Sequence, residues 1–280
     1  SDTLNYATTG SIDHTISKVD KADSDYYVKV QKIIEDHAIE ASICKVLGSE
    51  ALAYCVDTCV QIFGGSGFCE EYPAAGVYRD ERINRIFEGT NEINRLLISG
   101  ILLKKSILEE MPIRDVIFKR SGDKIPDVNQ KGHELEKEMT VIEYSRSLTL
   151  ETLNNLINVY GQDLKNKQWV LEPLADVAVS LSVMHNGFCR YNQLENGIHK
   201  DRTLPVLRVS IAEHFESMIK NVKEINSHIA DKMNFNDDSD KKSFCDLDEA
   251  LTLDYHVNKI NLKKEICEEF YKNEKYYLNV

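Results

Sequence analysis

Apolar side chains recur at steps of three and four residues along most of the chain, a spacing that predicts amphipathic helices. The clearest case is residues 26–63, where alternation of period two is absent and a strand is therefore excluded. We expect one long helix there, with His37 as a hydrogen-bonded core histidine. Its predicted apolar face consists of Ile33, Ile34, His37, Ala38, Ala41, Cys44, Leu47, Ala51, Tyr54, Cys55 and Val60.

The same periodicity predicts the remaining elements. Around the long helix, further helices are expected at residues 2–17, 74–86 and 90–110, and the acidic stretch 20–25 indicates a loop. In the second half, helices are expected at 132–159, 168–195, 203–233 and 246–276, with Gly161 ending the first of these and a polar turn at 234–240. The charged residues of the short helix, Glu81 and Arg82 among them, are expected to form a solvated face.

Residues 111–130 mark the predicted boundary between two domains. They contain Pro112, Gly122 and Pro126 among mixed charges, without a clean hydrophobic period, which is typical of a linker. The expected fold is therefore all-α, with one helical bundle at residues 1–110 and a second at 131–280. Because the second bundle contains no recognisable catalytic constellation, we expect it to serve packing and assembly.

Composition narrows the possible functions. A net charge of −12 argues against a nucleic-acid partner, and no stretch approaches the ~18 consecutive apolar residues of a membrane span. The sequence contains no zinc-binding motif, so we expect no metal site. The seven cysteines are scattered and form no CxxC pair, which favours a reduced protein in the cytoplasm or another intracellular compartment.

Two turns carry the candidate chemistry. Gly64, Gly65 and Gly67 follow an apolar helical run, and glycines there end a helix and allow close backbone approach. Further along, Glu88–Asn91 separates two amphipathic segments, and Thr90 or Asn91 is a good N-cap for the second. A carboxylate, a glycine and exposed amides thus meet at a helix N-terminus, which favours anions. Each turn taken alone is an ordinary connection between helices.

Taken in order, the segments QIFGGSGF, EEYP, YRDERI and IFEGTNEINR resemble the C-terminal domain of the acyl-CoA dehydrogenases, over residues 2–105. Residues 39–50 resemble that family's long core helix. Residues 169–176 resemble the C-terminal extension of its larger, very-long-chain members. The resemblance implies an FAD-dependent oxidoreductase of fatty acid β-oxidation, which converts acyl-CoA thioesters to trans-2-enoyl-CoA.

The resemblance also implies the roles of site residues. Glu88 matches the catalytic base, its backbone N–H would donate to the thioester oxygen, and Gly89 would let the substrate approach. Some family members place the base on another helix, which would overlap residues 1–17. The positions assigned to FAD are Thr90, at the pyrophosphate, Glu92, near the same cofactor, and Gly64. Gln61 and Gly65 match positions that touch the adenine end of the FAD bound by a neighbouring subunit.

The implied assembly is a homo-oligomer, most simply a dimer, which passes electrons to an electron-transfer protein. The family's N-terminal helical domain and middle β domain have no counterpart in these 280 residues. We therefore expect a fragment, or a subunit whose other half is a separate chain, that alone is inactive and does not retain FAD. The alternative is a non-catalytic helical interaction module that keeps the motif by inheritance.

Overall fold

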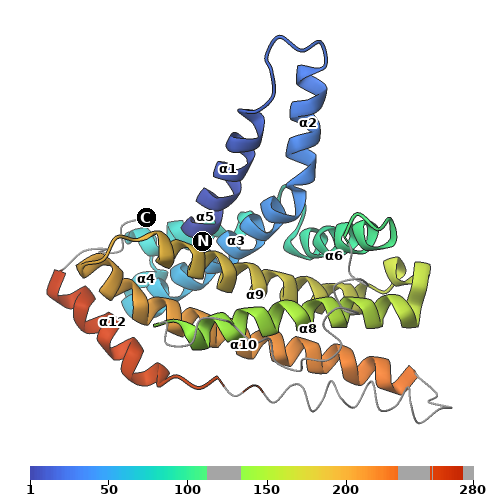
Figure 1. Cartoon of the computed structure of the whole chain (residues 1–280). Helices are drawn as coiled ribbons and strands as arrows, with labels where there is room; N and C mark the ends of the chain where they lie inside the picture. Colours follow the sequence, from blue (N-terminus) through green and yellow to red (C-terminus); the bar gives the residue numbers. More distant parts are fainter. Residues whose placement is uncertain (112–133, 233–252, 254, 274–280) are drawn as a thin grey trace. The chain divides into compact units, whose positions relative to one another are not determined.

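The computed structural model describes residues 1–111, 134–232, 253 and 255–273. Every regular element within these ranges is a helix, which confirms the all-α fold (Figure 1). The chain divides into two units, Ser1–Ile101 and Leu102–Val280, and the division falls within helix α6 (Asn91–Ile107). The predicted linker lies almost wholly outside the described residues, so the boundaries 1–110, 111–130 and 131–280 stay a prediction.

The first unit is organised around helix α3 (Ala38–Phe63). The helices packed most closely on it are α1 (Asp2–Ile16), α2 (Tyr26–Asp36), α4 (Gly65–Phe68), α5 (Pro73–Arg82) and the short 3₁₀ helix η1 (Ile83–Arg85), and the start of α6 is joined to it by hydrogen bonds. Figure 1 shows α1 and α2 as a hairpin whose loop contains the acidic residues predicted to be irregular. Two of the helix boundaries follow from residues with strong backbone preferences: Pro73 begins α5, and Gly64 ends α3.

The prediction of one helix over residues 26–63 is wrong, because the chain leaves helical geometry at His37. With φ −97° and ψ 15°, His37 is both the last flanking residue of α2 and the first of α3. The half-buried imidazole is hydrogen-bonded on both sides, at 2.8 Å from the Ile33 carbonyl and 3.0 Å from Ser11 Oγ. The histidine is thus satisfied, as expected, but at a helix junction that sequence periodicity alone does not reveal.

The predicted apolar face of this region is also largely wrong. Ala41, Ala51, Tyr54 and Cys55 are exposed on α3, as is Ile34 on α2. The residues that α3 buries are Ser42, Ile43, Val46, Ser49 and Val56. The error has a physical reason, since α3 carries apolar residues all round and its sequence pattern therefore does not mark one face.

Helix α3 has a further property that follows from this apolar composition. Among the described helices, it is long and apolar enough to cross a membrane by length and composition. Core helices of globular proteins meet the same criterion, so the expected absence of a transmembrane segment stays a prediction.

Glu81 on α5 was expected to be solvated but is 2% exposed. It forms an ion pair with Arg85, at 3.3 Å from Nε, one helical turn later. Arg82 is exposed, as expected for a solvated face. The chain continues from α5 into η1, which places Arg85 one turn after Glu81 and gives the buried carboxylate a charged partner.

The second unit is a bundle built on helices α8 (Glu136–Tyr160), α9 (Gln168–Gln193) and α10 (Ile198–Lys232). The three pack against one another, and α12 (Lys259–Asn273) packs on α10 (Figure 1). Gly161, with φ 52°, ends α8 as predicted, and the 3₁₀ helix η2 (Gly161–Asn166) leads into α9. The core of the bundle is a continuous apolar cluster that includes Leu148, Val177, Met184, Ile211 and Met218.

Two helix starts differ from the predicted ones. Helix α10 begins at Ile198 and not near residue 203, so Pro205 lies inside the helix, although proline suits a first turn best. The last helix begins at Lys259 and not near 246, because residues 255–258 are not helical. The predicted turn at 234–240 and the rest of the predicted helix 246–276 lie outside the described residues.

One buried carboxylate connects this non-helical segment to the bundle. Glu138 on α8 is 3% exposed, and its Oε1 accepts hydrogen bonds from the Tyr255 hydroxyl and from Arg208 Nε, both at 3.0 Å. Burial, followed by the Glu138 carboxylate, raises the pKa of Tyr255, which keeps the hydroxyl protonated and able to donate. Tyr255 therefore fixes the chain that leads into α12.

We predict that Tyr255→Phe lowers the free energy of unfolding by ~1–3 kcal/mol, because it leaves a buried charged oxygen with one donor fewer. Tyr144→Phe is the matched control: the Tyr144 hydroxyl is buried in the same core and has no hydrogen-bond partner among the described residues. Its removal should be neutral or stabilising. Urea unfolding followed by circular dichroism measures both variants, and equal losses of stability would contradict the assignment.

Candidate functional site

The two sequence motifs lie in turns at opposite parts of α3. Gly64 ends α3 with φ 59°, and its N–H donates to the Gln61 carbonyl at 3.2 Å. Gln61, Gly64 and Gly65 are all exposed, and a Cβ at Gly64 or Gly65 would meet nothing within 4 Å. The backbone here is therefore open to approach from outside the chain.

Gly67 explains why the glycine cluster continues into α4. A Cβ at this position would lie 2.6 Å from the Val60 carbonyl oxygen and 2.8 Å from Phe63 Cβ. These distances are too short for any side chain, so α4 can fold back against the end of α3 only with glycine there. Packing thus requires glycine at position 67, whereas the backbone at Gly64 and Gly65 is not covered by other atoms of the chain.

The second turn holds two consecutive residues in the left-handed region. Glu88 has φ 55° and Gly89 has φ 80°. The conformation is ordinary for Gly89 but costs a glutamate ~1–2 kcal/mol, since its Cβ crowds the backbone. Both residues are exposed in this chain. A strained residue of this kind persists only where its surroundings hold it.

Thr90 and Glu92 occupy the N-terminal turn of α6. The Thr90 hydroxyl accepts a hydrogen bond from the Ile93 N–H at 3.3 Å, so Thr90 is the N-cap, one of the two residues proposed for that role. The backbone N–H of Glu92 and then the Thr90 hydroxyl hold the pKa of the Glu92 carboxyl below its usual value. A lowered pKa is what the positive end of a helix dipole and nearby N–H and O–H donors produce for a carboxyl group in the first turn.

A polar network that the sequence did not predict joins this turn to α3. Lys45 Nζ donates to the Gly89 carbonyl at 2.8 Å and to Asn91 Oδ1 at 2.7 Å. Asn91, only 3% exposed, donates to Ser49 Oγ at 3.0 Å and to Glu50 Oε1 at 3.1 Å. Its buried amide therefore has partners for both of its polar atoms.

Arg95 closes the network at its outer end. Its two terminal nitrogens donate to the two oxygens of Glu50, at 2.7 and 3.0 Å, in a bidentate ion pair. On α3, Lys45 and Ser49 are one helical turn apart and therefore lie on the same side, toward the start of α6.

The structure brings four predicted site residues together and keeps three apart from them. Glu88, Gly89, Thr90 and Glu92 belong to one turn, which meets α3 at Lys45. Gln61 lies ~24 Å further along α3 at a rise of 1.5 Å per residue, next to Gly64 and Gly65. The two groups therefore do not form one compact site within this unit.

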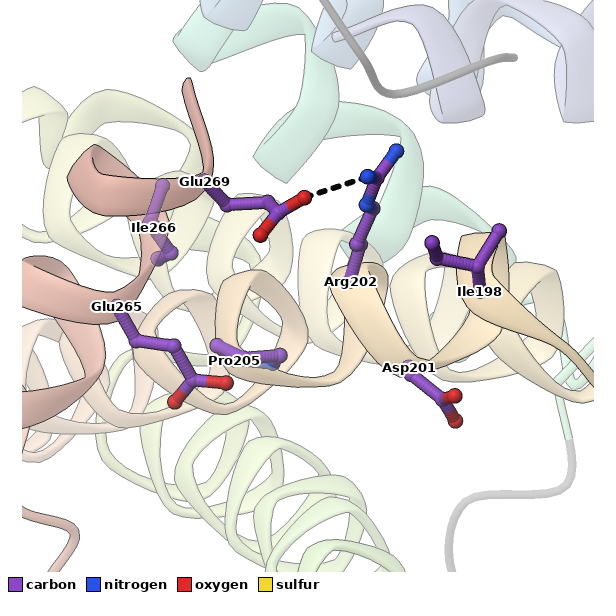
Figure 2. A pocket seen from close by; sticks show the side chains of 7 residues that line it. All are labelled: Ile198, Asp201, Arg202, Pro205, Glu265, Ile266 and Glu269. Carbon is purple, nitrogen blue, oxygen red and sulfur yellow. Dashed lines mark ion pairs between the residues drawn. The ribbon is translucent and has the colours of Figure 1, made fainter. Parts of the chain in front are cut away.

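A pocket of about 230 Å³ occurs elsewhere, in the second unit between α10 and α12 (Figure 2). Its walls include Ile198, Pro205 and Ile266, and the Arg202–Glu269 ion pair of 2.5 Å spans it. None of the predicted site residues lines it. Within the described residues, no group of three or more histidine, cysteine, aspartate or glutamate side chains is arranged to hold a metal ion.

Comparisons with known proteins identify the first unit. Residues 25–103 match the family model described as the acyl-CoA dehydrogenase C-terminal domain. The chain is 35% identical over 188 residues to a probable acyl-CoA dehydrogenase of Bacillus subtilis, covering 66% of this chain and 32% of that protein. It is 33% identical over 171 residues to the very long-chain specific acyl-CoA dehydrogenase of Bos taurus, covering 53% of this chain and 26% of the relative.

The structural comparison extends over both units. A crystal structure of an acyl-CoA dehydrogenase complexed with FAD, from Bacillus anthracis, superposes with a TM-score of 0.87 at 30% sequence identity. The match covers 98% of this chain and 47% of that one. The chain thus spans about a third or less of the two sequence relatives and about half of the crystallised protein.

We predict that Gly89→Ala destabilises the first unit by ~1–3 kcal/mol, because alanine at φ 80° is strained and its Cβ would lie 3.2 Å from Asn94 Nδ2. Gly48→Ala is the matched control, since Gly48 lies within α3 and a Cβ there meets nothing within 4 Å. It should stabilise the unit by ~0.5–1 kcal/mol. Thermal unfolding compares the two, and a tolerated Gly89→Ala would exclude the left-handed turn.

Proposed function

Because this chain belongs to the acyl-CoA dehydrogenase family, as the C-terminal helical part of its members, we propose that it supplies the base and part of the FAD site of an enzyme that dehydrogenates acyl-CoA thioesters to trans-2-enoyl-CoA. The observation that carries this proposal is the left-handed Glu88–Gly89 turn at the start of α6, held to α3 by Lys45 and Asn91. A residue whose strained backbone conformation is fixed by a buried polar network is typical of a functional site.

Glu88 has the role of general base in this proposal. Its carboxylate would remove the α proton of the thioester, while its backbone N–H would donate to the thioester oxygen and stabilise the developing negative charge. Gly89, with no side chain, leaves the substrate room beside that backbone. When bound, FAD would supply the acceptor for the β hydride.

The donors at the start of α6 fit the anionic part of FAD. The Glu92 N–H and the Thr90 hydroxyl hold the Glu92 carboxylate, which stands in for a phosphate oxygen at these donors. A bound pyrophosphate would take these donors, so the carboxylate would have to turn away. The exposed Gln61 and the open backbone at Gly64 and Gly65 suit the adenine end of a dinucleotide.

The distance between the two groups supports a role for two cofactors. Since Gln61 lies ~24 Å along α3 from Lys45 and the Glu88 turn, one chain would serve its own FAD at α6 and a neighbour's FAD at the glycine cluster. Assembly, most simply a symmetric dimer, would then complete the site. The exposed apolar residues near the end of α3, among them Ile62, Phe63 and Phe68, support such an interface.

The remaining partners follow from the same reaction. Dehydrogenation of the substrate releases two electrons that need an acceptor outside this chain, so we propose an electron-transfer protein for that role. The six described cysteines are free, which supports a reducing, intracellular setting such as the cytoplasm.

The first test concerns the base. Glu88→Gln keeps the size of the side chain and the backbone N–H but removes the base. Anaerobic stopped-flow bleaching of the flavin by saturating acyl-CoA should slow by ~10²–10⁴-fold in the complete enzyme, while acyl-CoA binding is retained. Glu71→Gln, at an exposed position outside the two turns, is the control and should bleach at the unmodified rate. Bleaching of Glu88→Gln within a few-fold of the unmodified rate would move the base to another residue, for example one in residues 1–17.

The second test concerns cofactor retention. In this chain Gln61, Gly65, Glu88 and Glu92 are all exposed, so a flavin bound here would keep much of its surface in water. We predict that the 280-residue chain, mixed with FAD and passed through gel filtration, elutes without the cofactor and shows no activity on acyl-CoA. Elution with one flavin per chain, measured by visible absorbance, would overturn this prediction.

A further inference from the structure

The conformation of Glu88 requires a restraint that the α6 helix does not provide by itself. The residue precedes the N-cap, so no helical hydrogen bond of α6 fixes its φ and ψ. Asn94 donates to the Gly89 carbonyl at 2.9 Å, but it belongs to α6 and moves with it. A contact from a different element is needed to fix the turn relative to the body of the unit.

Lys45 makes that contact. Its ammonium group, on α3, donates to the carbonyl of Gly89, the residue directly after Glu88, at 2.8 Å. The same group donates to Asn91 Oδ1 at 2.7 Å, so it holds the turn on both sides of the Thr90 cap. Restraining the Gly89 carbonyl restrains the orientation of the peptide plane that follows the left-handed pair.

The other bonds between α3 and this region act further along α6. Glu50 and Ser49 bind Asn91, and Glu50 also binds Arg95, so these contacts attach the first turns of the helix. None of these three contacts reaches Glu88 or Gly89. In the described network, the bond from Lys45 to Gly89 is the one that transmits the position of α3 to the strained turn.

We propose that Lys45 is a positioning residue for Glu88, which holds the carboxylate in its reactive orientation through the Gly89 carbonyl without touching the substrate. This inference rests on the proposed role of Glu88 as the base. A displacement of ~1 Å of a reacting group can cost ~10²-fold in rate, so a loosened turn should slow proton removal strongly even where the fold survives.

The test compares Lys45→Met with three other variants. Methionine keeps the length and apolar stem of lysine and removes the charge and all donors. Lys45→Arg restores donors at the same place. Glu50→Gln removes the charge that pairs with Arg95 but keeps an oxygen that can accept from Asn91, so it weakens the attachment of α6 to α3 without a direct contact to Glu88 or Gly89. Lys29→Met removes the ammonium group of the exposed Lys29–Asp23 ion pair, between α2 and the loop that precedes it.

In the flavin-loaded enzyme, Lys45→Met should lower the rate of flavin reduction by ~10–100-fold, with the KM for acyl-CoA changed less than about threefold. Lys45→Arg should recover most of this loss, and Glu50→Gln and Lys29→Met should reduce the flavin within about threefold of the unmodified rate. An equal loss in Glu50→Gln and Lys45→Met would overturn the proposal, because general attachment of α6 would then explain the effect. So would an unchanged rate in Lys45→Met.

A second readout does not depend on activity. In the 280-residue chain, amide hydrogen exchange in the peptide that covers residues 88–94 should be faster in Lys45→Met by about tenfold and unchanged in Lys29→Met. The proposed function is wrong if the unmodified enzyme does not bleach the flavin, or if Glu88→Gln bleaches it as fast as the unmodified enzyme does. The positioning role of Lys45 in catalysis is then also wrong. The exchange data would still show whether Lys45 holds the turn. If bleaching behaves as proposed and exchange is unchanged in Lys45→Met, the positioning role alone is wrong.

Discussion

The hydrogen bonds of Lys45 and Asn91 between α3 and the start of α6 are the constraint on which the candidate site depends. Asn91 is buried, and a buried amide without partners would cost ~1–3 kcal/mol, so the helices must meet in the register that satisfies it. In that register Lys45 reaches the Gly89 carbonyl, and the left-handed backbone of Glu88 and Gly89 is held. The strain of a glutamate at φ 55° is thus offset by polar contacts that lie outside the turn itself.

The proposed reaction requires that the orientation of Glu88 is fixed, and it also requires that its carboxylate is desolvated. A carboxylate becomes a strong base only when water is removed from it, yet Glu88 is exposed in this chain. The chain therefore provides orientation, whereas the flavin, the acyl group and further protein surface must provide the cover. The same reasoning applies to α3, whose exposed apolar residues such as Tyr54 and Ile62 are suited to burial by a partner surface.

The sequence predicted most of the helices, an N-cap at Thr90 or Asn91 and the glycine end of α3, because each depends on local spacing and on residues with strong backbone preferences. It did not predict which face of α3 is buried, since a helix that is apolar all round carries no facial signal. The break at His37 was not predicted either, and one hydrogen-bond partner of this histidine, Ser11, lies on another helix, out of reach of a local pattern. The network around Asn91 likewise depends on partners more than 40 positions apart, which periodicity cannot pair.

The two units differ in how their stability and their function are arranged. The second unit encloses a continuous apolar core, and its buried Glu138 is satisfied from within by Arg208 and Tyr255. In the first unit, the buried polar network lies next to the exposed, left-handed Glu88–Gly89 turn. Both sequence motifs contain residues that are exposed to solvent. A self-contained bundle in one unit and exposed motifs in the other are what is expected if the second unit provides packing and the first carries the proposed site. The separation of Gln61 from the Glu88 turn, ~24 Å along α3, agrees with the proposal that one chain contributes to two cofactors of an assembly.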